Sequence, residues 1–123
     1  MTEITVKQVL KNRAYKFSVA VLRFLDEFTK EKKVSYALAD QLLRSATSVG
    51  ANIVEAKSSS SKKEFVRYFE IALKSANETK YWLCLFRDGL QADKNKMTDL
   101  IGEADEISKM LASSILTMKG KRL

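Results

Sequence analysis

Two stretches of the sequence place polar residues among small and apolar ones, and these polar residues are the best candidates for a site with chemistry. They are Arg44, Ser48, Asn52 and Glu55 in the first stretch and Ser75 and Glu78 in the second. Side chains three, four or seven residues apart share a face of a helix, so each set would line one side of a helix. If the two sides meet, Arg44 can pair with a carboxylate while Asn52 and Ser75 satisfy backbone groups. We interpret the set as a buried polar layer that fixes helix register, with a ligand-binding pocket as the alternative.

The composition excludes several kinds of catalytic site. The chain has no histidine and a single cysteine, Cys84, which excludes a zinc site, a Cys/His nucleophile pair and an intramolecular disulfide. Di-iron bundles need Glu-x-x-His pairs, and neither a phosphate-binding loop nor a dinucleotide fingerprint occurs. Apart from Glu55 and Glu78, the acidic residues fall mostly on polar helix faces. We therefore predict that the protein is not an enzyme and holds no cofactor or metal ion.

The positive charge of the chain is the other feature with a functional meaning. The formal net charge is +7 and the pI is near 9.5, which suits contact with RNA, DNA or an acidic protein. The excess is largest over residues 1–33, so basic residues of the first predicted helix lead our candidates for phosphate contacts. The candidates are Lys7, Lys11, Lys16, Arg23 and Lys30, followed by Lys62, Lys63, Lys119, Lys121 and Arg122. We see no aromatic platform on that face and expect no sequence-specific reading of bases.

Four long segments with helical periodicity must position these residues. The chain of 123 residues has no proline and only four glycines, so helix breakers are almost absent. Apolar residues recur at helical spacing over about residues 4–30, 36–57, 61–90 and 93–118. The short links between these segments suit antiparallel neighbours. We predict an all-α fold, an antiparallel up-down-up-down four-helix bundle formed by residues 1–123 as a single domain.

The starts of these helices and their inner faces can also be predicted. Thr5 with Gln8, and Ser61 with Glu64, match capping boxes, and Ser35 suits an N-cap. Small residues at 45–51 would let a neighbouring backbone approach closely. The predicted inner faces are Leu10, Phe17, Val21, Phe24 and Phe28; Leu38, Leu42, Ser45, Val49, Asn52 or Ile53, and Ala56; Phe65, Phe69, Ala72, Ala76, Thr79, Leu83, Phe86 and Leu90; and Met97, Leu100 or Ile101, Ala104, Ile107, Leu111, Ile115 and Met118.

The third predicted helix is apolar over more of its circumference than one core needs. A second ladder, Ile71, Ser75, Glu78, Trp82 and Leu85, lies about 120° around this helix from the first, at about 100° per residue. A bundle helix normally buries one stripe about 100° wide. We therefore predict a homo-oligomer with Trp82 and Leu85 close to the interface.

The sequence lacks the signals of a membrane or secreted protein. No apolar core of signal-peptide length follows the first residues, and no window approaches 18 uncharged apolar residues. We expect a cytoplasmic protein without a membrane partner.

The stretch that contains the polar residues also resembles a known family. Residues 44–56, RSATSVGANIVEA, with Glu64-Phe65 and the run from Ile71 to Glu78, resemble the four helix bundle proteins, also called S23 or 23S rRNA intervening-sequence proteins. The family pattern has an arginine, then S-x-x-x-N-I-x-E-G, E-F and I-A-x-G-S-x-x-E. The matching positions are Arg44, Ser48, Asn52, Ile53, Glu55, Glu64, Phe65, Ile71, Ala72, Ser75 and Glu78. Ala56 and Lys74 replace two glycines of that pattern, which raises helix propensity.

The resemblance implies a bundle that assembles as a ring-like homopentamer. Some members of the family are encoded within inserts in 23S rRNA genes. Similar proteins act as accessory subunits of retroelement reverse transcriptases and bind the enzyme and RNA through a basic surface.

We conclude from the sequence that the chain is a non-enzymatic, self-associating bundle that binds RNA or a nucleic-acid enzyme through basic residues. One alternative is a protein-interaction scaffold that binds no nucleic acid. The other is a small-molecule-binding bundle centred on Asn52, Glu55 and Glu78.

Overall fold

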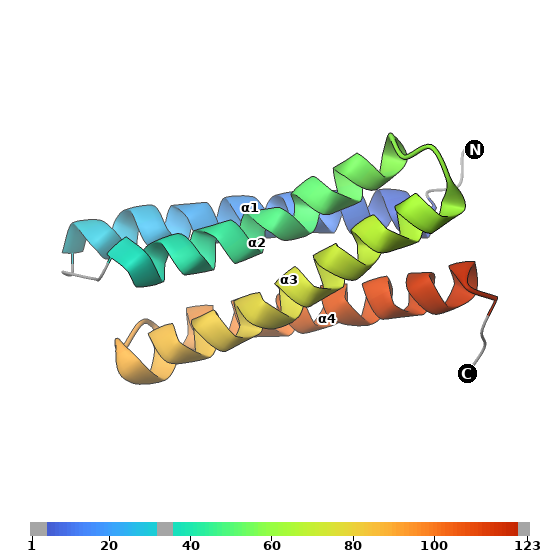
Figure 1. Cartoon of the computed structure of the whole chain (residues 1–123). Coiled ribbons are helices and arrows are strands. Elements are labelled where there is room, and N and C mark those ends of the chain that lie inside the picture. The colour runs from blue at the N-terminus through green and yellow to red at the C-terminus, as the bar shows by residue number, and fades with distance from the viewer. Residues whose placement is uncertain (1–4, 32–35, 121–123) are drawn as a thin grey trace.

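The computed structural model describes residues 5–31 and 36–120. These residues form four α-helices and the links that join the second helix to the third and the third to the fourth. They are α1 (Val6–Glu31), α2 (Tyr36–Lys57), α3 (Lys62–Gly89) and α4 (Lys94–Met118). The helices run up-down-up-down, so that α1 begins and α4 ends at the same end of the bundle as the link between α2 and α3 (Figure 1). The predicted all-α four-helix bundle is confirmed, with helix boundaries within a few residues of those predicted.

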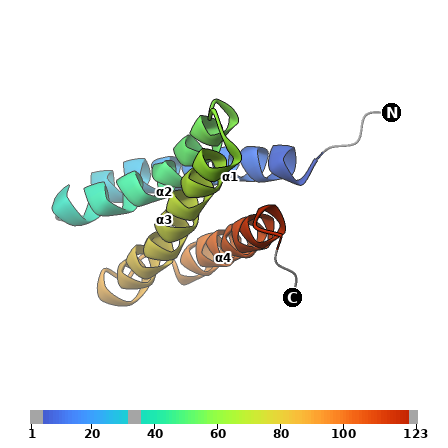
Figure 2. The same ribbon diagram turned by 45° about the vertical axis from the view of Figure 1, so that its right-hand side comes forward.

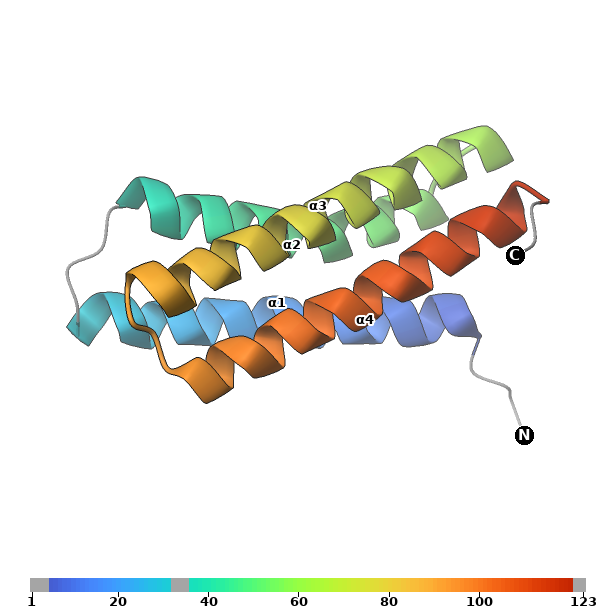
Figure 3. The same ribbon diagram turned by 90° about the horizontal axis from the view of Figure 1, so that it is seen from below.

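The helices form two layered pairs. Each helix contacts its two neighbours in the order α1, α2, α3 and α4, and α4 closes the ring on α1. The α1–α2 pair is inclined to the α3–α4 pair, which is clearest in Figures 2 and 3. No helix in the described part of the chain is both long enough and apolar enough to cross a membrane.

Capping side chains set where the helices begin. The Thr5–Gln8 capping box is confirmed in both directions, because each backbone N–H donates to the other side chain, at 3.1 and 3.2 Å. At α3, the Ser61 hydroxyl accepts from the Glu64 N–H at 3.1 Å as predicted, but the Glu64 carboxylate accepts from the Ser60 hydroxyl at 3.4 Å. Side-chain caps of this kind satisfy the free N–H groups of the first turn. The predicted cap at residue 35 lies outside the described residues.

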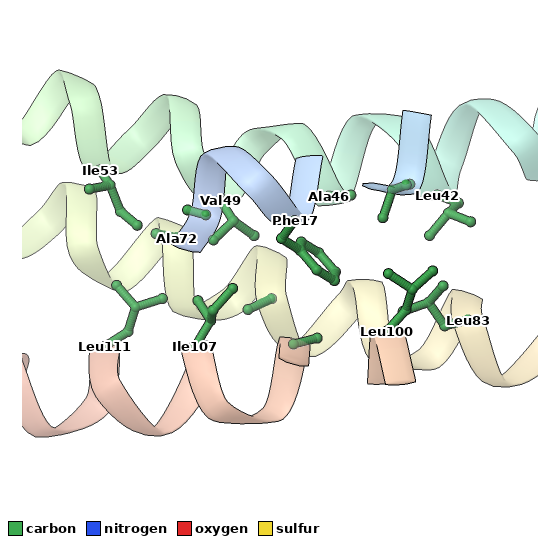
Figure 4. Packing of buried hydrophobic residues seen from close by; sticks show 14 of the residues in the cluster. Phe17, Leu42, Ala46, Val49, Ile53, Ala72, Leu83, Leu100, Ile107 and Leu111 are labelled. Atoms are coloured by element: carbon green, nitrogen blue, oxygen red, sulfur yellow. The ribbon is translucent and has the colours of Figure 1, made fainter. Parts of the chain in front are cut away.

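The core runs along the whole bundle, and Figure 4 shows part of it from close by. The five residues of the predicted stripe on α1 are all buried, and most of the predicted inner faces of the other helices are buried with them. Leu38, Phe65, Leu90 and Met118 are only partly buried and pack against the edge of the core. Burying a large apolar side chain contributes roughly 1.5–3 kcal/mol, so this continuous core stabilises both ends of the bundle.

Small residues bring α1 and α2 close together, as the sequence predicts. A Cβ added at Gly50 would lie 3.6 Å from the Cβ of Ala14, in ordinary van der Waals contact. One turn away, the Ser18 hydroxyl reaches the Ala46 carbonyl at 3.5 Å. The short side chains therefore allow side-by-side packing of the two backbones.

Candidate nucleic-acid interface

The predicted polar layer exists between α2 and α3, but with fewer members. The Asn52 amide donates to the Ser48 carbonyl at 2.8 Å and to the Ser48 hydroxyl at 3.0 Å, and the Ser75 hydroxyl donates to the Ser48 hydroxyl at 2.9 Å. The buried hydroxyls of Ser45 and Thr79 lie 3.0 Å apart one turn away. Sequence reasoning assigned those two residues to the apolar inner faces and missed this pairing.

Three charged residues that we predicted for this layer do not belong to it. Arg44 has a side chain that is 77% exposed, and it lies 3.8 Å from Asp40 on its own helix. Glu55 and Glu78 are exposed as well, and Glu78 accepts from the indole N–H of Trp82 at 2.9 Å. The prediction of a buried ion pair is wrong because the side of α2 that meets α3 is centred on Ser45 and Ser48, which leaves Arg44 at the water-exposed edge.

The same placement removes the basis for a pocket at this layer. Asn52, Glu55 and Glu78 line none of four hollows on the described surface. Among the described residues, no group of three or more His, Cys, Asp or Glu side chains could hold a metal ion.

Charge is distributed very unevenly along the bundle. Two contacts between helices define a cross-section near the middle of the bundle. Ser18 of α1 contacts Ala46 of α2, and the Ser108 hydroxyl of α4 donates to the Asn77 side chain of α3 at 3.2 Å. On the side of the chain termini, which we call the basic half, lie residues 5–18, 46–77 and 108–120. These include eleven basic residues and three acidic ones, a net charge of +8. The acidic half comprises residues 19–31, 36–45 and 78–107, with seven basic and eleven acidic residues, a net charge of −4.

The two halves also differ in how their cations are paired. In the acidic half, five of the seven basic side chains form ion pairs within 4.0 Å, whereas in the basic half only three of the eleven do. Within the described part of the chain, eight cations of the basic half have no acidic partner. They are Lys7, Lys11, Lys16, Lys57, Lys62, Lys63, Arg67 and Lys74. Unpaired cations are the ones available to phosphate groups.

Ion pairs tie the two halves together near the cross-section. Arg13 of α1 donates two hydrogen bonds to the Glu103 carboxylate of α4, at 2.6 and 2.9 Å, and this raises the pKa of the guanidinium. Asp105 of α4 accepts from Lys80 of α3 and pairs with Lys109, and these hydrogen bonds hold the pKa of Asp105 below its ordinary value. Arg13, Lys80 and Lys109 are therefore engaged internally.

Two hollows flank the first turns of α3 in the basic half. The first, which we call the aromatic hollow, has a volume of about 500 Å³ and lies between α1, α2 and α3. Lys7, Lys11 and Lys57 line it together with Phe65 and Phe69, and none of the described residues that line it is acidic. The second, the α3–α4 hollow, is lined by basic residues of α3 and by Lys119, and the acidic residues Glu64 and Glu70 line it as well. The start of α3 is thus surrounded by cations on both sides.

The predicted phosphate-contacting residues fall into both halves of the bundle. Lys7, Lys11, Lys16, Lys62, Lys63 and Lys119 lie in the basic half, although Lys119 pairs with Glu70 at 2.9 Å. Arg23 and Lys30 lie in the acidic half, and Lys30 pairs with Asp26 at 3.2 Å. Lys121 and Arg122 lie outside the described residues.

Of the eight cations of the basic half that pair with no described acidic residue, sequence reasoning missed three: Lys57, Arg67 and Lys74. The antiparallel order of the predicted helices could have identified them, because it brings the end of α2 and the start of α3 beside the start of α1.

The second ladder of α3 is partly exposed. Ile71 is 38% exposed and Tyr81, which precedes Trp82 in the chain, is 60% exposed, whereas Trp82 and Leu85 are half-buried. The ring of Trp82 lies edge-on to that of Tyr81, with centroids 5.3 Å apart. This face therefore presents apolar side chains to the outside of the bundle.

Comparison with known proteins assigns the family. A family model described as 23S rRNA-intervening sequence protein matches residues 7–113. The chain belongs to this family. It is also similar to a crystal structure of a protein of unknown function from the S23 ribosomal protein family of Bacteroides thetaiotaomicron. The two chains are 34% identical, with a TM-score of 0.85, and the match covers 90% of this chain and 98% of the other. No curated protein matches this chain. The resemblance of residues 44–78 to this family is thereby confirmed.

Proposed function

We propose that this member of the 23S rRNA-intervening sequence family is a non-enzymatic bundle that binds the phosphate backbone of RNA through its basic half. The observation that supports this most directly is the set of eight cations in that half that lack an acidic partner among the described residues. Folding leaves them unpaired although the chain contains 15 acidic residues. Unpaired cations on one surface repel one another, and a polyanion relieves this repulsion while releasing its own counterions.

Salt dependence of RNA binding tests the proposal. A fluorescently labelled RNA should bind the wild-type chain, and the logarithm of the association constant should fall linearly with the logarithm of salt concentration. Each neutralised phosphate contributes a slope of about −0.7 for single strands and about −0.9 for a duplex, so four contacts give about −3 to −4. Binding that is absent at micromolar protein in 50–100 mM salt would favour an interaction scaffold whose charge serves solubility.

We also propose that the bundle self-associates through the second ladder of α3. Apolar patches on monomers are usually small, and Ile71, Tyr81, Trp82 and Leu85 would be covered if α3 met another copy. A closed homo-oligomer, a pentamer as the family resemblance implies, would bury this face in every copy.

Light scattering tests self-association independently of RNA. We expect a mass several times 13.9 kDa, and a shift toward monomer for Leu85→Glu, because a carboxylate in an apolar interface is costly. Tyr15→Glu is a matched control, since Tyr15 is 70% exposed on α1. A wild-type chain that is monomeric at tens of micromolar would contradict the proposal.

A further inference from the structure

The aromatic hollow joins an apolar floor to a basic rim. Phe65 and Phe69 of α3 form the aromatic part of the floor, with ring centroids 4.8 Å apart and planes tilted by 35°. Lys7, Lys11 and Lys57 come from α1 and α2 to form the rim. A ligand that fits must present flat apolar groups to the floor and negative charge to the rim.

A flexible cation now covers the ring of Phe65. The Lys7 ammonium lies 4.6 Å from the ring centroid, while Phe69 on the same floor is only 1% exposed. An exposed lysine–aromatic contact is weaker than the stacking of a nucleobase on an aromatic ring. A base can therefore replace the ammonium on Phe65, and the released Lys7 can then reach a phosphate of the same strand.

The surroundings of the hollow favour a polyanion over a single small anion. Lys62, Lys63 and Arg67, which form no ion pair with a described residue, continue the basic surface around the start of α3 into the α3–α4 hollow, where Glu64 and Glu70 also lie. A small amphipathic anion would fill the aromatic hollow without contacting these three cations. A strand that crosses from one hollow to the other would contact both sets.

An unpaired strand fits this surface better than a duplex. The bases of A-form RNA are stacked inside the helix, and its deep major groove does not admit side chains. Single strands can turn a base outward onto an aromatic side chain. The hollow is concave and about 500 Å³ in volume, so it can enclose one base but not a double helix.

We propose that the aromatic hollow binds an unpaired nucleobase of single-stranded RNA, stacked on Phe65, with Lys7, Lys11 and Lys57 on the flanking phosphates. This inference rests on the RNA binding proposed above and specifies its substrate as unpaired RNA. The sequence predicted no aromatic platform near the basic residues, and the fold supplies one from α3.

Two RNA probes and three variants of the full chain test the proposal. The probes are a single-stranded oligoadenylate carrying one 2-aminopurine, whose fluorescence is quenched by stacking, and a duplex RNA with the same number of phosphates. Phe65→Leu keeps an apolar side chain and removes the ring, Phe65→Tyr keeps the ring, and Tyr15→Leu removes an exposed ring of the basic half that does not line the hollow. Circular dichroism and thermal melting establish that each variant is folded.

We expect the wild-type chain to quench the probe and to bind the single strand more tightly than the duplex. Phe65→Leu should weaken single-strand binding by about 5- to 100-fold, which corresponds to one lost base–aromatic stack. Its affinity for the duplex should change less than twofold. Phe65→Tyr and Tyr15→Leu should behave like the wild type.

Equal affinity of the wild type for the two probes, or an unchanged Phe65→Leu, would overturn the stacking proposal while RNA binding by the basic half would stand. The absence of salt-sensitive binding to either probe would instead overturn the proposed function. A third outcome concerns dodecanoate. If dodecanoate binds saturably and displaces the oligoadenylate, and the wild-type chain does not quench 2-aminopurine fluorescence, the hollow belongs to a small amphipathic anion and the inference is overturned.

Discussion

The two halves of this bundle share one core but have opposite surfaces. Phe24, Phe28 and Phe86 pack together in the acidic half, with centroids 5.2 to 5.8 Å apart, and Phe65 and Phe69 pack in the basic half. The four helices run through both halves, so the difference lies in side chains that face water. The acidic half neutralises most of its cations internally, whereas the basic half leaves eight unpaired.

This contrast separates what stabilises the fold from what serves a partner. Surface ion pairs contribute roughly 0–1 kcal/mol each, so the bundle does not depend on the pairs of its acidic half. Unpaired like charges add nothing to the stability of the fold, and the proposed function gives them an anionic partner. Under that proposal, the binding surface is the end of the bundle where α1 begins and α4 ends.

The largest effects should come from the shared core. Phe69→Ala in the basic half and Phe86→Ala in the acidic half should each lower the free energy of unfolding by about 3–5 kcal/mol, because both remove a fully buried ring and leave a cavity. Urea denaturation followed by circular dichroism measures both. If only one of the two variants lowers the free energy of unfolding by less than about 1 kcal/mol, the core is not continuous between the halves.

Removing the same charge from each half should affect RNA binding unequally. The Lys62→Gln, Lys63→Gln double variant should lower the magnitude of the salt slope for single-stranded RNA by about 1.4, or 0.7 for each lost contact. The matched Arg23→Gln, Lys94→Gln variant removes two cations of the acidic half that likewise form no ion pair with a described residue, and it should leave the slope nearly unchanged. If both variants weaken binding equally, net charge and not its location controls affinity.

The ion-pair cluster at Asp105 predicts a dependence of stability on pH. Its pKa is lowered from the ordinary value of 3.8 by hydrogen bonds from Lys80 and Lys109. A lowered carboxyl pKa means that the contribution to stability is present above pH 3.8 and disappears as the pH falls through the lower folded-state value. Asp105→Asn should therefore be less stable than wild type at pH 7, and the difference should vanish in strong acid. A difference that is independent of pH would show that the pairs contribute nothing.

The smallest effect should come from Arg44, the residue that sequence reasoning placed in a buried ion pair. Because its side chain is 77% exposed and its partner Asp40 lies on the same helix, Arg44→Ala should change the free energy of unfolding by less than about 0.5 kcal/mol. Thermal unfolding measures this directly. A loss near 3 kcal/mol, the scale for orphaning one partner of a buried pair, would restore the original interpretation.

The sequence by itself determined the helices, their caps and most of the core. Apolar spacing and capping residues act within a few turns of one helix, so positions such as Phe17, Val49 and Leu111 could be assigned without knowing any neighbour. The motifs around Asn52 and Ser75 similarly sufficed to recognise the family.

Only the tertiary structure decided which surface residues lie together. Along the chain, Lys7 is far from Lys57 and Lys63, and the antiparallel packing of α1, α2 and α3 gathers the three at one end of the bundle. Helical periodicity likewise could not decide between Arg44 and Ser45 as neighbours of α3, because one residue turns a helix by only about 100° and the outcome depends on how the partner helix is rotated. Local physics fixes periodicity, whereas the azimuth of each helix and the grouping of charges depend on packing between helices.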